Sequence, residues 1–121
     1  MKTASRIFTG AGIWGLLVIL PLYGLEDRMN AWAPPAMNHP EMFYGFVGVG
    51  LAWQVAFLII GSDPVRYRPL MPAAMLEKAT YVGALVTLYA KGRAPALVLG
   101  PAVADGALGA LFVLAWVLTK G

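Results

Sequence analysis

The sequence contains no cysteine and only one histidine, and charged residues make up only 12% of its 121 residues. The lack of cysteine excludes disulfides, thiol redox chemistry and metal or iron–sulfur centres with cysteine ligands. The single histidine, His39, lies two residues before Glu41, and two such ligands are too few for a metal site. We therefore predict no metal here, and we interpret the stretch from His39 to Glu41 as a helix start with Pro40 in its first turn.

The scarcity of charge also argues against a soluble domain, which carries about 25% charged residues. This chain has 60% hydrophobic residues and a mean hydropathy of +0.70. The net charge is +3, but the basic residues are scattered near the ends of apolar runs. Such scatter indicates membrane topology rather than a nucleic-acid surface. We therefore predict a membrane protein whose surroundings are the lipid bilayer and which has no nucleic-acid partner.

Four apolar segments are each close to the ~20 residues that a helix needs to cross a membrane, and they cover about residues 7–25, 42–61, 72–90 and 96–118. They lack the alternating polarity of barrel strands, so we expect helices, which satisfy their own backbone hydrogen bonds. The first segment is longer than the apolar core of a signal peptide and should be retained. The predicted fold class is all-α: a single membrane domain, residues 1–121, forming a four-transmembrane-helix antiparallel bundle.

The distribution of lysine and arginine favours cytoplasmic N- and C-termini. The inner side would then hold five basic residues and the outer side three: Lys2, Arg6, Arg66, Arg68 and Lys120 against Arg28, Lys91 and Arg93. The long outer loop, residues 26–41, contains Trp32 as a candidate interfacial anchor. Arg66 and Arg68 lie in the inner loop, where we expect them to bind lipid headgroups.

Glycines are frequent within the predicted spans. The stretch from Gly10 to Gly15 matches G-x-G-x-x-G, but a dinucleotide site needs a preceding strand and a βαβ unit. Small residues in a span instead allow helices to approach closely, within one chain or between chains. We therefore predict helix packing at Gly10, Gly45, Gly48, Gly106 and Gly109.

Asp105 lies near the centre of the last span, where a charge costs at least ~2.5–3.5 kcal/mol. Three further polar side chains, Gln54, Glu77 and Tyr81, fall within spans. At 1.5 Å per residue, Asp105 lies roughly 14 Å from the outer end, Tyr81 about 16 Å, Gln54 about 18 Å and Glu77 about 22 Å. Glu77 and Tyr81 share a helix face. The four could form one polar track that serves as a ligand or proton site.

A structural role is the alternative for these residues. Asp105 could donate a proton to a backbone carbonyl or to Gln54 and so fix helix packing. Glu77 could pair with Lys78 or with the basic inner loop, and a contact with another subunit is a third alternative.

The stretch from His39 to Gly92, which includes "FYGFVGVGLAWQVAFLIIGSDPVRYRPLMPAAMLEKATY", resembles small four-span bacterial membrane proteins of the DoxX-like type. The likeness covers the second and third spans, and the first and last match only in layout. The resemblance implies a four-helix bundle in the bacterial inner (cytoplasmic) membrane. Some DoxX-like proteins are associated with quinone-linked oxidoreductase complexes, so the resemblance implies a role as a subunit. Sterol-isomerase-like four-span proteins, similar in layout only, also place buried acids around a lipid cavity.

Three classes of function follow. The first is a membrane-complex subunit or homo-oligomeric scaffold that acts through helix packing. The second is a binding or carrier protein for a hydrophobic ligand, either a lipid or a quinone, that uses the polar track. The third is a lipid-modifying enzyme with Asp105 or Glu77 as an acid–base group. No cofactor is identified, although a quinone or lipid would fit the second class.

Overall fold

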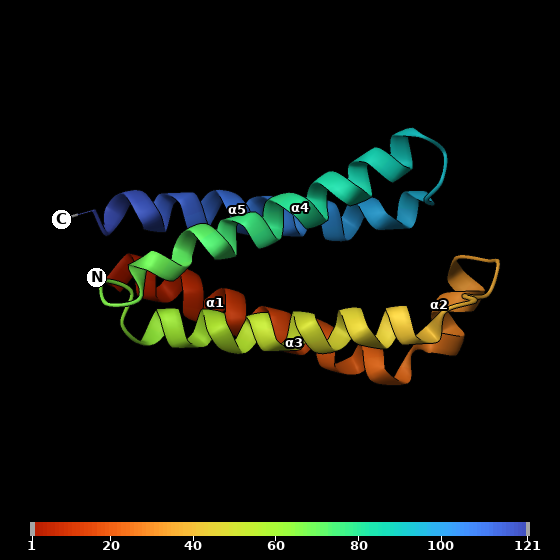
Figure 1. Ribbon diagram of the computed structural model, residues 1–121, viewed down its shortest axis with the longest axis horizontal. Helices are drawn as coiled ribbons and strands as arrows, with labels where there is room; N and C mark the ends of the chain where they lie inside the picture. Colours follow the sequence, from red (N-terminus) through yellow and green to blue (C-terminus); the bar gives the residue numbers. More distant parts are fainter. Residues whose placement is uncertain (1, 121) are drawn as a thin grey trace.

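The structure is a computed structural model that describes residues 2–120, and within that range it is helical, without a strand. Long α-helices run alternately in opposite directions (Figure 1): α1 (Lys2–Ile19), α3 (Pro40–Ser62), α4 (Met71–Ala90) and α5 (Leu99–Leu118). Shorter elements join them: the 3-10 turns η1 (Leu20–Gly24), η2 (Arg68–Leu70) and η3 (Ala96–Val98), and the helix α2 (Glu26–Trp32). The prediction of an all-α fold is confirmed.

Three segments of residues 2–120 are long and apolar enough to cross a membrane, namely Lys2–Gly24, Pro40–Ser62 and Ala96–Leu118. They correspond to three of the four expected spans. The remaining expected span corresponds to α4, which has 20 residues. Its average hydropathy is lowered by the adjacent charged residues Glu77 and Lys78 in its first half.

Prolines mark several helix boundaries. The α-helical hydrogen bonding of α1 ends at Ile19, and the 3-10 turn η1 that follows contains Pro21. Proline has no backbone N–H and therefore cannot donate the next hydrogen bond of an α-helix. Helix α3 begins at Pro40, directly after His39. The segment is therefore a helix start with Pro40 in the first turn, as expected. The ring nitrogen Nδ1 of His39 lies 3.1 Å from Oε1 of Glu41.

The helices form two pairs: α1 packs against α3, and α4 packs against α5. Contact between the pairs is made largely by α1 and α5, through a buried aromatic cluster. The rings of Phe8 and Phe112 stack with centroids 4.3 Å apart, and Phe57 meets Phe112 edge-on at 4.9 Å. All three phenylalanines are fully buried, and each contributes the large apolar area and ring geometry that stabilise such a core.

This core lies toward one end of the molecule, which we call the closed end: it holds both chain termini and the loop between α3 and α4 (Figure 1). Toward the opposite end, which holds α2 and the loop between α4 and η3, the two pairs diverge (Figure 1). We call this the open end. The antiparallel arrangement places the five basic residues of the predicted inner group at or near the closed end, because they belong to the termini and the α3–α4 loop.

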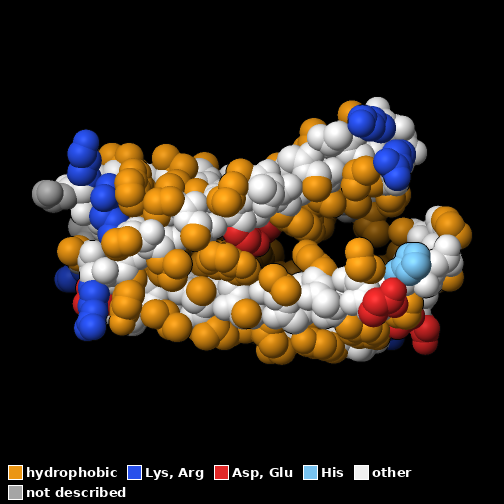
Figure 2. All heavy atoms as spheres, in the orientation of Figure 1, with side chains coloured by type: hydrophobic (Ala, Val, Ile, Leu, Met, Phe, Trp, Pro, Cys, Tyr) orange, Lys and Arg blue, Asp and Glu red, His pale blue; other side chains and the backbone are white. Residues whose placement is uncertain are grey.

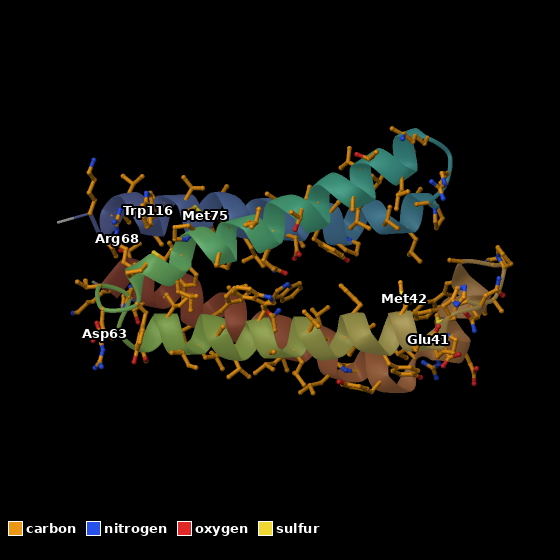
Figure 3. The ribbon with its side chains drawn as sticks, in the orientation of Figure 1. Glu41, Met42, Asp63, Arg68, Met75 and Trp116 are labelled. Atoms are coloured by element: carbon orange, nitrogen blue, oxygen red, sulfur yellow. The ribbon has the colours of Figure 1, made fainter. Side chains whose placement is uncertain are left out.

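The α4–α5 pair is fastened at the closed end by Arg68, which lies beside Trp116 (Figure 3). The guanidinium donates hydrogen bonds to the carbonyl oxygen of Trp116 at 3.0 and 3.2 Å and to the hydroxyl of Thr119 at 3.1 Å. It also lies 3.5 Å from the centroid of the Trp116 ring. A cation at this position satisfies one of the unpaired carbonyls that end α5.

Candidate functional site

A cleft of about 390 Å³ lies between the two helix pairs, within the size range of small-molecule sites. Its walls are largely apolar and come from both pairs, with Trp14 and Val18 from α1, Phe43 and Phe46 from α3, and Leu108 from α5. Figure 2 shows the hollow opening toward the open end, with an acidic side chain at its inner end. The aromatic core that packs the two pairs together lies toward the closed end, and the cleft lies beyond it, where the pairs diverge.

Three charged side chains meet at the inner end of the cleft. The Nζ atom of Lys78 lies 3.3 Å from Oδ2 of Asp105 and 3.6 Å from Oε2 of Glu77. The Lys78 side chain is only 5% exposed, and those of Glu77 and Asp105 are 20% and 19% exposed. We call these three residues the charged cluster. A buried lysine requires such partners, because an isolated charge in an apolar interior is very costly.

The backbone of α5 explains how Lys78 reaches Asp105. Asp105 and Gly109 are four residues apart and therefore share one face of α5. A Cβ atom on Gly109 would lie 3.2 Å from Cβ of Lys78, so the glycine leaves room for the lysine stem between α4 and α5. The ammonium group then lies between Asp105 and the aromatic core, 5.2 Å from the centroid of the Phe57 ring.

Gln54 and Tyr81 also line the cleft. Gln54 is 2% exposed, and its Nε2 donates a hydrogen bond to the carbonyl of Gly50 at 2.8 Å. Its amide occupies space that a side chain on Gly15 of α1 would fill. Tyr81 stacks its ring on Phe46 of α3, with centroids 5.7 Å apart and planes 16° apart. That stack joins the two pairs along one wall of the cleft.

The structure thus brings Asp105, Glu77, Gln54 and Tyr81 to one cleft. Asp105 pairs with Lys78 rather than with Gln54, whose amide bonds to its own helix. The site residue that sequence reasoning misses is Lys78, which enters it only as a neighbour of Glu77. The signal that could have found it is its place in the middle of an otherwise apolar stretch, where a lysine needs a partner as much as an aspartate does.

A second, shallower groove of about 550 Å³ runs between α4 and α5. Lys78 and Asp105 border this groove as well as the cleft, so their ion pair lies between the two. The rest of the groove is lined by small and branched apolar residues, including Ala79, Gly83 and Ala110.

The predicted packing glycines differ in their surroundings. Within residues 2–120, a Cβ on Gly10, Gly45 or Gly106 would meet no atom within 4 Å, so these three do not lie at a helix contact inside the chain. A Cβ on Gly48 would lie 3.7 Å from the hydroxyl of Tyr23, and a Cβ on Gly109 would contact the side chain of Lys78. The closest helix approaches instead involve the glycines Gly12, Gly15 and Gly61.

The residues predicted to lie at the membrane interface differ in the contacts that they make. Trp32, 58% exposed, ends α2 at the open end, where it is free to contact an interface. The backbone N–H of Arg66 donates to Asp63 at 3.3 Å, and its guanidinium lies over the Tyr67 ring. The guanidinium of Arg68 binds the end of α5, where the carbonyl of Trp116 offers it a partly buried acceptor.

The cleft combines apolar walls with hydrogen-bond donors and acceptors at one end, a composition common to small-molecule sites. A scan against models of protein families and searches of curated proteins and of solved structures found no match.

Proposed function

We propose that this chain is a four-span protein of the bacterial inner membrane, with cytoplasmic termini, that binds a hydrophobic or amphiphilic molecule in the cleft. One observation carries the proposal: an apolar cleft of about 390 Å³ ends at a cluster of charged side chains inside a helical protein with three apolar candidate spans. Polar groups at membrane depth are expensive and are commonly retained for function.

The surroundings of α4 support its role as the fourth span. At 1.5 Å per residue its 20 residues extend about 30 Å, enough for the hydrocarbon core. Its two charged residues, Glu77 and Lys78, line the cleft, and Lys78 pairs with Asp105 of α5. The hydroxyl of Thr80, which is exposed, donates to backbone carbonyls of its own helix. The lipid-facing surface of α4 is therefore more apolar than its composition suggests.

The test uses one variant that fills the cleft and a matched variant that does not. Gly100 lines the cleft, whereas Gly45 does not, and a Cβ on either glycine would meet no neighbour within 4 Å. We compare Gly100→Leu with Gly45→Leu. Thermal unfolding in detergent is measured with decylubiquinone, with oleic acid and with a neutral diacylglycerol as probes.

A ligand that binds the folded state raises its stability in proportion to the logarithm of ligand concentration over Kd. We expect at least one probe class to raise the melting temperature of the wild type and of Gly45→Leu, but not of Gly100→Leu. Equal shifts in the two variants, or no shift with any probe, would contradict binding in the cleft.

A subunit role is the second candidate, and the groove between α4 and α5 favours it. Gly83 and Gly106 line this groove, and a Cβ on either glycine would meet no atom within 4 Å. The groove therefore offers a shallow surface suited to a helix of a partner or of a second copy. Native mass spectrometry after gentle extraction tests it: a fixed ratio to other proteins or to itself supports a subunit, and a monomer contradicts it. A DoxX-like complex is the partner that the sequence resemblance would suggest.

A further inference from the structure

The charged cluster contains more negative than positive groups, and this imbalance indicates what the cleft binds. Among the described residues that line the cleft, the charged ones are Glu77, Lys78 and Asp105. Two carboxylates and one ammonium leave one negative charge unbalanced when all three are ionised. In a low-dielectric interior an unbalanced charge is far more costly than a balanced pair.

Glu77 is the carboxylate that is less well satisfied. Asp105 lies 3.3 Å from the lysine nitrogen, and Glu77 lies 3.6 Å away. The Oε2 atom of Glu77 is buried, and it has no hydrogen-bond partner within residues 2–120. Lys78 therefore interacts more closely with Asp105, and the Oε2 atom of Glu77 has the longer ion contact with Lys78 and no hydrogen bond among the described residues.

The walls of the cleft that Glu77 lines also supply aromatic surfaces. Trp14, Phe43, Phe46 and Tyr81 all line it. Aromatic faces attract cations, most strongly in sites without water. A cation with apolar substituents would therefore meet the walls favourably and would also balance the cluster, whereas an anion would add a second unbalanced charge.

We propose that the cleft selects lipophilic cations, meaning amphiphilic or aromatic molecules with an ammonium or similar onium group, and that Glu77 is their counter-ion. This inference rests on the proposed function, since it names the class of molecule that enters the cleft.

Two ions of nearly equal size and opposite charge test the proposal: tetraphenylphosphonium and tetraphenylborate. Each is titrated by equilibrium dialysis against the full chain in nanodiscs of zwitterionic phosphatidylcholine, with empty nanodiscs correcting for partition into lipid. The variants are Glu77→Gln and Asp63→Asn, which remove the same charge. Asp63 is an exposed residue at the closed end (Figure 3), away from the cleft.

We expect saturable binding of the cation at one site per chain, at least about tenfold tighter than binding of the anion, which corresponds to about 1.4 kcal/mol. Asp63→Asn should retain this affinity, and Glu77→Gln should lose about tenfold or more. The comparison of the two ions on the wild type stands even if Glu77→Gln does not fold.

Equal or tighter binding of the anion overturns the proposal, and so does unchanged cation affinity in a folded Glu77→Gln variant. If a neutral probe binds in a way that Gly100→Leu abolishes while the cation does not bind, the cleft is a ligand site and only the cation selectivity fails. If Gly100→Leu affects no probe at all, the proposed function itself fails.

Discussion

At the scale of single residues, Lys78 is the side chain on which the buried charges depend. This side chain is 5% exposed, and its Nζ atom lies within 4 Å of two carboxylates. Removing one partner of a buried ion pair commonly costs about 3–5 kcal/mol, because the other charge remains buried and alone. We expect Lys78→Met to lower the stability of the protein by an amount in this range, measured by thermal unfolding in detergent.

The exposed residue Lys120 provides the control: Lys120→Met should leave the unfolding temperature nearly unchanged. Adding Asp105→Asn to Lys78→Met should restore part of the lost stability, since the stranded carboxylate is removed. A Lys78→Met protein as stable as the wild type would show that the ion pair contributes nothing.

The candidate site could be predicted in part from the sequence because an acid at mid-membrane depth stands out whatever its partner. Asp105, Glu77, Gln54 and Tyr81 stand out as polar residues within spans, and all four line the cleft. Their pairing could not be predicted. Lys78 reaches Asp105 across two helices because Gly109 leaves room for its stem, and residue spacing along one helix carries no information about which face meets a neighbour.

At the scale of elements, the contact between α1 and α3 depends on glycines that only the structure identifies. A Cβ on Gly15 would overlap the amide of Gln54, whereas a Cβ on Gly10 of the same helix would meet nothing within 4 Å. We expect Gly15→Ala to destabilise the protein by about 1–3 kcal/mol, as overpacking does. Gly10→Ala should be neutral or stabilising by up to about 1 kcal/mol, because alanine favours the helix.

Thermal unfolding of both alanine variants measures this difference. The two variants are matched because they carry the same substitution in the same helix. Equal effects would mean that α1 and α3 do not approach at Gly15. The sequence could not tell which glycines meet a helix of the same chain: Gly10 and Gly15 look alike in it, and the rotation of α1 about its axis decides which of them meets α3.

Arg68 is the corresponding feature of the α4–α5 pair. Its guanidinium binds the carbonyl of Trp116 and the hydroxyl of Thr119 and covers the Trp116 ring. Hydrogen bonds to charged groups contribute about 1.5–3 kcal/mol, so we expect Arg68→Gln to lower stability by roughly that amount. Arg66→Gln is the matched control, because the side chain of Arg66 is exposed and its backbone makes the contact with Asp63. A loss of equal size in both variants would argue against fastening of α5 by Arg68.

At the scale of the whole molecule, the extents of the long helices were predictable because apolar run length is a direct physical requirement. The expected segments 42–61 and 96–118 correspond to Pro40–Ser62 and Ala96–Leu118. The divergence of the two pairs was not predictable. It arises because the aromatic core of Phe8, Phe57 and Phe112 lies near one end, a consequence of packing among three helices.

The whole-molecule prediction concerns α4, since the number of spans decides on which side each loop lies. The chain has no cysteine, so a single introduced cysteine is the only thiol. We choose Ala36→Cys before α3, Val65→Cys between α3 and α4, and Lys91→Cys after α4; all three positions are exposed. Intact bacterial cells that express each variant are treated with a membrane-impermeant maleimide, before and after permeabilisation.

If α4 crosses the membrane and the termini are cytoplasmic, Ala36→Cys and Lys91→Cys should react in intact cells, and Val65→Cys only after permeabilisation. The expectation follows from the alternating directions of α3, α4 and α5 and from the excess of lysine and arginine at the closed end. Reaction of Val65→Cys and Lys91→Cys on the same side would mean that α4 does not cross. A reversed pattern at all three positions would retain the four spans but invert the orientation, and the cleft would then open toward the cytoplasm.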